Sequence, residues 1–300
     1  MAMAVIVNSF IFRFIFAWIS SILVSVRGYS KRSLNFSGAL AAVIVGFTLT
    51  LAGYAFFASL LAFFTTSSLW TKWKSDKKRK IEEDFKEGGQ RNWLQVLCNG
   101  GFPSALCIIY LMEVGYKDRP VNYARDFPAS CLSMAVLGAI ACCNGDTWSS
   151  EIGIAVGSKT PRLITTLKRV PVGTNGAVSF VGTTASLIGG LFIGLVYYIS
   201  ILVLGFINSF TADYPAQWPV ILLGGFAGLF GSFIDSVLGA TLQYSGFCEE
   251  QKKVVSKPSS TVKHICGKNI LDNHLINLLS SSISGIVTSY IGYMAWQYIN

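Results

Sequence analysis

The chain has 300 residues, of which 52% are apolar and only 13% are charged, and its net charge is +9. A soluble globular protein carries about 25% charged residues, so this composition excludes an ordinary soluble domain and indicates an integral membrane protein. Basic loops on one side of a membrane explain the positive charge, and we therefore expect no nucleic-acid partner.

Apolar runs predict eight membrane-spanning helices. A helix crosses the hydrocarbon core with about 20 residues, and runs this long favour helices over a β-barrel. The second and third runs are short and are separated only at Gly53 and Tyr54, so residues 36–70 form either two passes or a re-entrant hairpin. We expect an all-α polytopic bundle, one membrane domain over 1–300, with spans at 4–26, 36–52, 54–70, 94–115, 126–143, 177–206, 218–240 and 273–298.

The basic residues indicate how the spans are oriented. With two passes between 36 and 70, every Lys and Arg falls on one face except Arg13, Lys117, Arg119 and Arg125. The positive-inside rule places this face in the cytosol and both termini on the other side. The cytosolic face then carries a basic loop at 71–93, a motif-rich loop at 144–176 and a third loop at 241–272.

Carboxylates gather at the cytosolic ends of the predicted spans. The segment CCNGDTWSSEIG (142–153) places Asp146 and Glu151 at the end of the fifth span, and Asp235 lies near the cytosolic end of the seventh. Acids beside the hydrocarbon are costly and are functional candidates. Their mutual repulsion is relieved by a cation, and Mg²⁺ prefers such oxygen ligands beside a phosphate. We predict that Asp146, Glu151 and Asp235 are catalytic residues and metal ligands. The alternatives are a helix cap at 144–153 and a structural acid at Asp235.

The segment KTPRLITTLKRVPVGTNG (159–176) supplies groups that suit phosphate. Arg162 and Lys168 can bind phosphate oxygens. The turn GTNG, which consists of Gly173, Thr174, Asn175 and Gly176, can present backbone N–H groups to an anion. Carboxylates, a metal, basic side chains and a glycine turn are the parts that phosphoryl transfer needs. The Gly-rich spans at 177–206 and 218–240 suit close helix packing, and we expect the lipid tail to lie along them.

Several motifs in this order resemble the transmembrane protein 19 family: SLNFSGALAAVIVGF (33–47), EGGQRNWLQVLCNGG (87–101), NGDTWSSEIG (144–153), the segment 161–190 and GSFIDSVLGATLQ (231–243). The resemblance runs from about residue 30 to the C-terminus. This family includes chloroplast phytyl-phosphate kinases and is similar to CTP-using prenol kinases. The resemblance implies Mg²⁺-dependent transfer of a phosphoryl group from CTP or another nucleoside triphosphate to an isoprenoid phosphate. The matching positions are Asn99, Asn144, Asp146, Glu151, Arg162, Lys168, Thr174, Asn175 and Asp235.

Two other functions stay open. The same family includes a plasma-membrane regulator of glucose response, which implies a non-enzymatic membrane regulator. A cation-coupled transporter is the third interpretation, and it predicts acids at mid-membrane depth on broken helices. The first residues lack the Ser- and Arg-rich pattern of a transit peptide. We therefore expect the plasma membrane or the endoplasmic reticulum and not the plastid.

Overall fold

The computed structural model describes residues 9–79, 81, 89–157, 160–208 and 214–299. Lys80, Lys86, Lys159 and the start of the span expected at 4–26 lie outside these residues. The elements are α2 (Phe10–Ser30), α3 (Phe36–Ala52), α4 (Tyr54–Lys72), α5 (Ser75–Arg79), α6 (Trp93–Glu113), α7 (Phe127–Val156), β1 (Arg162–Leu163), β2 (Ala177–Val178), α8 (Phe180–Asn208), α9 (Pro219–Leu242), β3 (Ser245–Cys248), β4 (Lys253–Val255), β5 (Val262–Cys266) and α10 (Asn273–Ile299).

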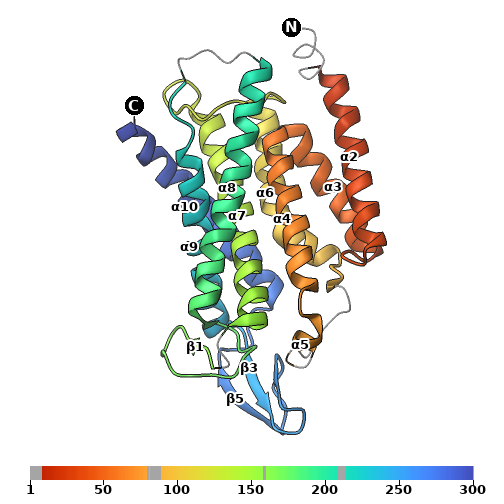
Figure 1. Cartoon of the computed structure of the whole chain (residues 1–300), viewed down its shortest axis with the longest axis vertical. Helices are drawn as coiled ribbons and strands as arrows, with labels where there is room; N and C mark the ends of the chain where they lie inside the picture. The colour runs from red at the N-terminus through yellow and green to blue at the C-terminus, as the bar shows by residue number, and fades with distance from the viewer. Residues whose placement is uncertain (1–8, 80, 82–88, 158–159, 209–213, 300) are drawn as a thin grey trace.

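All described helices except the short α5 form one bundle, and they correspond one to one to the eight predicted spans. Six of the described helices are long and apolar enough to cross a membrane, and α3 and α4 complete the bundle. The start of α2 and the end of α10 lie at one end of the bundle, whereas α5 and the small strands lie at the other (Figure 1). We call this second end the basic face. The all-α polytopic fold is thereby confirmed.

The doubtful stretch 36–70 is an antiparallel hairpin over the height of the bundle. At the basic face, the Asn35 amide donates to the Arg91 carbonyl at the start of α3 (3.0 Å). At the opposite end, Gly53 separates α3 from α4, and a Cβ there would lie 3.0 Å from Asp118 Oδ1 in the α6–α7 connection. Lys72 then returns to the basic face, where its ammonium donates to a backbone carbonyl just after α2 (2.6 Å). The structure therefore agrees with two passes.

A buried ion pair holds this hairpin turn and explains the arginine in the first span. Arg13 of α2 pairs with Asp118 (2.5 Å), and both side chains are almost fully buried. The guanidinium also donates to the Ala52 carbonyl at the C-terminal end of α3 (3.4 Å), while Asp118 accepts from the Ala55 amide at the start of α4 (3.2 Å). Each charge thus meets the helix end whose dipole it complements.

The centre of the bundle is α7, which contacts α4, α6, α8, α9 and α10. Glycines bring its neighbours into backbone contact. A Cβ on Gly190 of α8 would lie 2.3 Å from the Gly224 carbonyl of α9, and one on Gly145 of α7 would lie 2.7 Å from Gly228 Cα. The Gly-rich spans therefore pack closely, as expected, and their contact leaves no room for a lipid tail between α8 and α9. The expectation that a tail lies along these spans stays a prediction.

Two of the predicted loops contain regular structure. Helix α7 continues to Val156, so the first part of 144–176 is helical and not a loop. The polar side chains of this part of α7 contact other helices or line a cavity. They therefore have polar surroundings although the helix does not end there. The segment 241–272 contains an antiparallel sheet of order β4-β3-β5, with Phe247 opposite both Val254 and Lys263. Strands β1 and β2 pair over the loop 164–176.

Candidate functional site

A polar cavity of about 1050 Å³ opens between α7, α9, α10, the start of α6 and the loops of the basic face. It brings together Asp146 and Glu151 of α7, Asp235 of α9 and Asn99 of α6, together with the whole GTNG turn. Residues from four separate parts of the sequence therefore meet in one cavity. Asn144, Arg162 and Lys168 do not line it.

Asp146 lies deeper in the bundle than the sequence suggested. It is ten residues from the end of α7, or about 15 Å at 1.5 Å per residue. The contact between Gly145 and Gly228 presses α7 against α9 one turn before Ser232. The Ser232 hydroxyl consequently donates to Asp146 Oδ1 (3.2 Å). The packing glycine thus positions the carboxylate that follows it.

Asp235 lies one helical turn beyond Ser232 and is held by α10. Its Oδ2 accepts from the Ser280 hydroxyl (3.1 Å). The Asn277 amide also donates to this oxygen (3.2 Å) in the orientation that satisfies both of its ends. Side chains one turn apart lie about 5–6 Å from each other. The two carboxyl groups are therefore within roughly 10 Å of each other.

The two aspartates suit a divalent cation that is shared with a phosphate. Among the described residues, Asp146 Oδ2 and Asp235 Oδ1 make no hydrogen bond, so each carboxylate keeps one oxygen for another ligand. No group of three or more His, Cys, Asp or Glu side chains in the described part of the chain has the arrangement of a metal site. Mg²⁺ commonly uses one or two carboxylates and completes its shell with water and substrate phosphate. The pair fits that pattern.

Glu151, the third predicted ligand, is paired with a lysine. Its Oε2 accepts from Lys78 of α5 (2.5 Å) and its Oε1 from the Thr71 hydroxyl (2.7 Å). The same ammonium donates to the Trp70 and Thr71 carbonyls at the end of α4 (2.5 and 3.1 Å). Each Glu151 oxygen thus accepts one hydrogen bond within the protein. These contacts join α4, α5 and α7 through Glu151, and its role as a third metal ligand stays a prediction.

Asn144 is fully buried between three helices. Its amide donates to the Gly189 carbonyl of α8 (2.8 Å), and its oxygen accepts from Thr66 and Ser67 of α4 (3.2 and 3.4 Å). Every contact of this side chain is internal. The sequence placed Asn144 among the nucleotide-binding residues, whereas the structure places it in the core.

Asn144→Ala is expected to lower stability without weakening nucleotide binding. The change leaves two hydroxyls and a carbonyl without their buried partner, and an unsatisfied buried group costs about 1–3 kcal/mol. Thermal unfolding of the purified protein in detergent measures the first effect, and nucleotide titration measures the second. An unchanged melting temperature together with lost nucleotide affinity would contradict this assignment.

The GTNG turn lines the cavity but also joins two substructures. The Asn175 side-chain Nδ2 donates to the Tyr244 carbonyl and the Ser245 hydroxyl (3.2 and 2.8 Å), and these bonds connect the turn to β3. Gly176 has φ +73°, and a Cβ there would lie 2.4 Å from an α9 carbonyl. The backbone N–H groups of Thr174 and Asn175 donate within the protein. Those of Gly173 and Gly176 make no hydrogen bond among the described residues, so half of the predicted anion nest is available.

Arg162 and Lys168 lie on the outside of the β1–β2 hairpin. Both side chains are exposed, and the Arg162 guanidinium donates to the Leu167 carbonyl of its own loop (2.8 Å). Arg162→Ala and Lys168→Ala are therefore expected to change the phosphoryl transfer predicted from the sequence by less than about threefold, because surface substitutions away from a site cost little. Steady-state rates at saturating and limiting nucleotide test this. A tenfold rise in the KM for nucleotide would show that the hairpin folds over the cavity.

The structure puts other cations in the cavity. Arg91 and Lys257 line it, from the segment before α6 and from the β4–β5 connection. The Arg91 guanidinium donates to the Ser68 hydroxyl (3.0 Å). Burial lowers the pKa of Arg91, and the Glu151 carboxylate opposes that effect. The group stays charged because an arginine pKa lies far above neutral. Arg91 is in the motif EGGQR, and its position just before a predicted span was the signal available in the sequence.

Comparison with known proteins identifies relatives over nearly the whole chain. The profile of a family described as "Integral membrane protein DUF92" matches residues 19–285. Protein PGR of Arabidopsis thaliana is 46% identical over 93% of this chain and 96% of its own length. Protein VTE6, chloroplastic, of the same plant is 33% identical over 70% of this chain and 56% of its own length. An uncharacterized membrane protein of Methanocaldococcus jannaschii, MJ0933, is 28% identical over 86% and 85%. No solved structure matches.

Proposed function

The chain belongs to the DUF92 family of integral membrane proteins, and from that premise we propose that it is an isoprenoid-phosphate kinase embedded in the membrane. The family expected from the sequence motifs is the one found. The observation that carries the proposal is the pair Asp146 and Asp235, which face one large polar cavity between membrane-spanning helices with cations around its rim. Such acids are retained inside a membrane protein when they have a function.

The proposed reaction makes a diphosphate from a lipid monophosphate. An oxygen of the isoprenoid monophosphate attacks the γ-phosphorus of a nucleoside triphosphate, for which CTP is the expected donor. The bond from that phosphorus to the β-phosphate oxygen breaks, and the nucleoside diphosphate leaves. The acceptor is already an anion at neutral pH, so no strong base is required. Positioning and charge neutralisation then supply most of the rate enhancement.

The residues of the cavity divide these tasks. Asp146 and Asp235 would hold Mg²⁺, which neutralises the phosphate charge that develops during transfer. Lys257 and the free N–H groups of the GTNG turn lie on the wall formed by the loops, where they can bind the triphosphate. Arg91 lines the cavity from a different part of the chain, the segment before α6. The cavity thus has separate basic groups for two phosphate-bearing substrates.

The test is phosphoryl transfer by the purified full chain in detergent. We would supply Mg²⁺ with CTP or ATP and offer phytyl, geranylgeranyl and farnesyl monophosphates. Diphosphate formed with one donor preferred supports the proposal and identifies that donor. No product from any pair, with the protein folded and monodisperse, favours the alternative, a non-enzymatic membrane regulator. We also propose that the basic face lies in the cytosol of a plasma-membrane or endoplasmic-reticulum protein, which cysteine accessibility in sealed vesicles would test.

A cation-coupled transporter is the other possible outcome. The depth of Asp146 suits ion passage, but α7 and α9 run unbroken through both aspartates. Transporters typically bind their ions at interrupted helices. Uptake of cations into vesicles that contain the protein, without nucleotide turnover, would favour transport over the kinase.

A further inference from the structure

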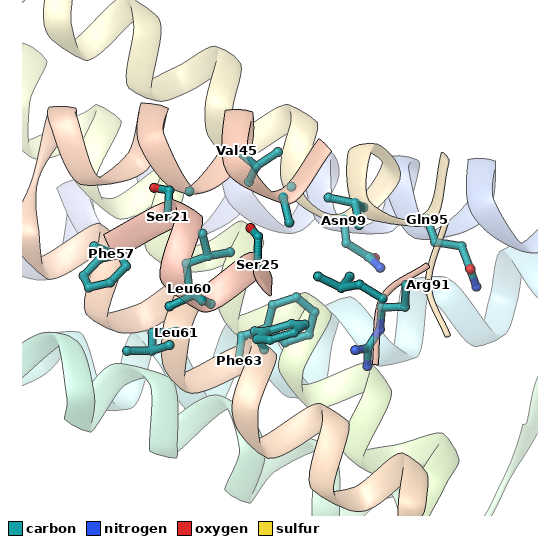
Figure 2. A pocket seen from close by; sticks show the side chains of 17 residues that line it. Ser21, Ser25, Val45, Phe57, Leu60, Leu61, Phe63, Arg91, Gln95 and Asn99 are labelled. Carbon is teal, nitrogen blue, oxygen red and sulfur yellow. The ribbon is translucent and has the colours of Figure 1, made fainter. Parts of the chain in front are cut away.

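A second pocket, apolar, lies between α2, α3, α4 and α6. Figure 2 shows the apolar side chains of Phe57, Leu60 and Leu61 at one end of this pocket and Arg91 at the opposite end. Serines of α2 complete the lining, and the Oγ atoms of Ser21 and Ser25 are buried without a hydrogen-bond partner in the described structure.

The apolar pocket and the polar cavity share a wall. Arg91, Gln95 and Asn99 line both, and Figure 2 shows these three side chains together at one end of the apolar pocket. A ligand that occupies both spaces must therefore be apolar along its length and anionic where it passes Arg91. A lipid phosphate has this chemistry.

We infer that the apolar pocket receives the hydrocarbon chain of the isoprenoid phosphate, with its phosphate beside Arg91. This inference rests on the proposed function and names the tail site of the same enzyme. It differs from the Gly-rich spans α8 and α9 that the sequence suggested for the tail, whose shared interface is closed by backbone contacts. The Arg91 fork can bind a phosphate through two parallel hydrogen bonds.

The size of the pocket restricts which part of the chain it holds. Its free volume is about 80 Å³. A water requires roughly 10–15 Å³ by this measure, so the space corresponds to about six waters, or one to two isoprene units. Phe57, Leu60 and Leu61 are only partly buried. A longer chain therefore leaves the pocket past these residues, between the helices and towards the lipid. The pocket would therefore discriminate between lipids by their first isoprene units and not by the far end of the hydrocarbon chain.

Ser25→Leu tests the pocket with a matched control. The larger side chain fills most of the free space, and the serine hydroxyl makes no hydrogen bond that would be lost. Ser20→Leu changes the same residue type on the same helix outside the pocket. We expect Ser25→Leu to weaken binding of farnesyl and geranylgeranyl monophosphate by about tenfold or more, because steric exclusion from a pocket costs at least that. Ser20→Leu should stay within about twofold.

A photoreactive probe gives a readout that does not depend on turnover or on a variant. Geranylgeranyl monophosphate with a diazirine on its first isoprene unit should crosslink the wild-type full chain at pocket residues of α3 or α4, and the matching prenol should crosslink far less. Labels on α8 and α9, or no effect of Ser25→Leu, would overturn the inference even if phosphoryl transfer occurs. Equal labelling by the prenol would assign the pocket to bilayer lipid and overturn it too. Pocket labels without any phosphoryl transfer would keep the lipid-phosphate site and reject the kinase.

Discussion

Asp146→Asn is expected to reduce phosphoryl transfer by at least about 100-fold while the protein remains folded. The change keeps the shape of the side chain and its contact with Ser232 but removes the negative charge that a cation needs. Losing one electrostatic contact to a transition state typically costs about 10²–10³ in rate. The measurement is product formation per folded protein, with size-exclusion chromatography as the check on folding. Asp235→Asn should behave in the same way, because the two side chains are proposed to act on one ion.

The matched control is Asp126→Asn. Asp126 precedes α7 at the opposite end of the bundle and pairs with Arg119 in a partly exposed ion pair. Exposed pairs of this kind contribute about 0–1 kcal/mol, so this variant should keep full activity. Equal loss in Asp126→Asn and Asp146→Asn would indicate a general effect of removing acids. Full activity in Asp146→Asn would remove the central residue of the proposed mechanism.

The helices were predictable from the sequence because burial in lipid requires long apolar runs. Gly53 and the distribution of basic residues were enough to indicate the α3–α4 hairpin. Arg13 was visible as an unusual charge in a span, but its pairing with Asp118 could be found only from the fold. The extent of α7 was not predictable in this way. A polar stretch such as NGDTWSSE is typical of a loop, and it stays helical here only because other helices and a cavity surround its polar side chains.

The candidate site was predictable for residues that a packing motif brings inward and not for those that a loop carries. Asp146 and Asp235 follow glycine-packed segments of two helices, so their convergence depends on helix contacts that the glycine pattern indicates. The side chains of Arg162 and Lys168 depend on the path of a loop, and the β1–β2 pairing turns them outwards. Arg91, which we propose for the cationic role, lies beside α3 because its backbone pairs with that of Leu34.

Lys78→Met is expected to destabilise the protein by about 3 kcal/mol, and adding Glu151→Gln should restore much of that loss. Removing one partner of a buried ion pair leaves the other charge uncompensated, which costs roughly 3–5 kcal/mol. Glu151 borders the cavity, so the lower end applies. In the double variant no charge is stranded, although the α4 carbonyls still lose their cation. A double-mutant cycle of thermal stability in detergent isolates the coupling between the two side chains.

The activity of the same variants separates the two roles proposed for Glu151. If Glu151 only joins α4, α5 and α7, the stable double variant should transfer phosphate within about tenfold of the wild type, because Asp146 and Asp235 are intact. If Glu151 is a metal ligand, Glu151→Gln and the double variant should both lose at least about 100-fold in activity per folded protein. That result would identify Glu151 as a metal ligand. The Lys78 ammonium would then have to move away from Glu151 when substrate binds. The distance between Lys78 and Glu151 would then change during the reaction. Arg91 would be the next residue to test, because its guanidinium interacts electrostatically with the Glu151 carboxylate.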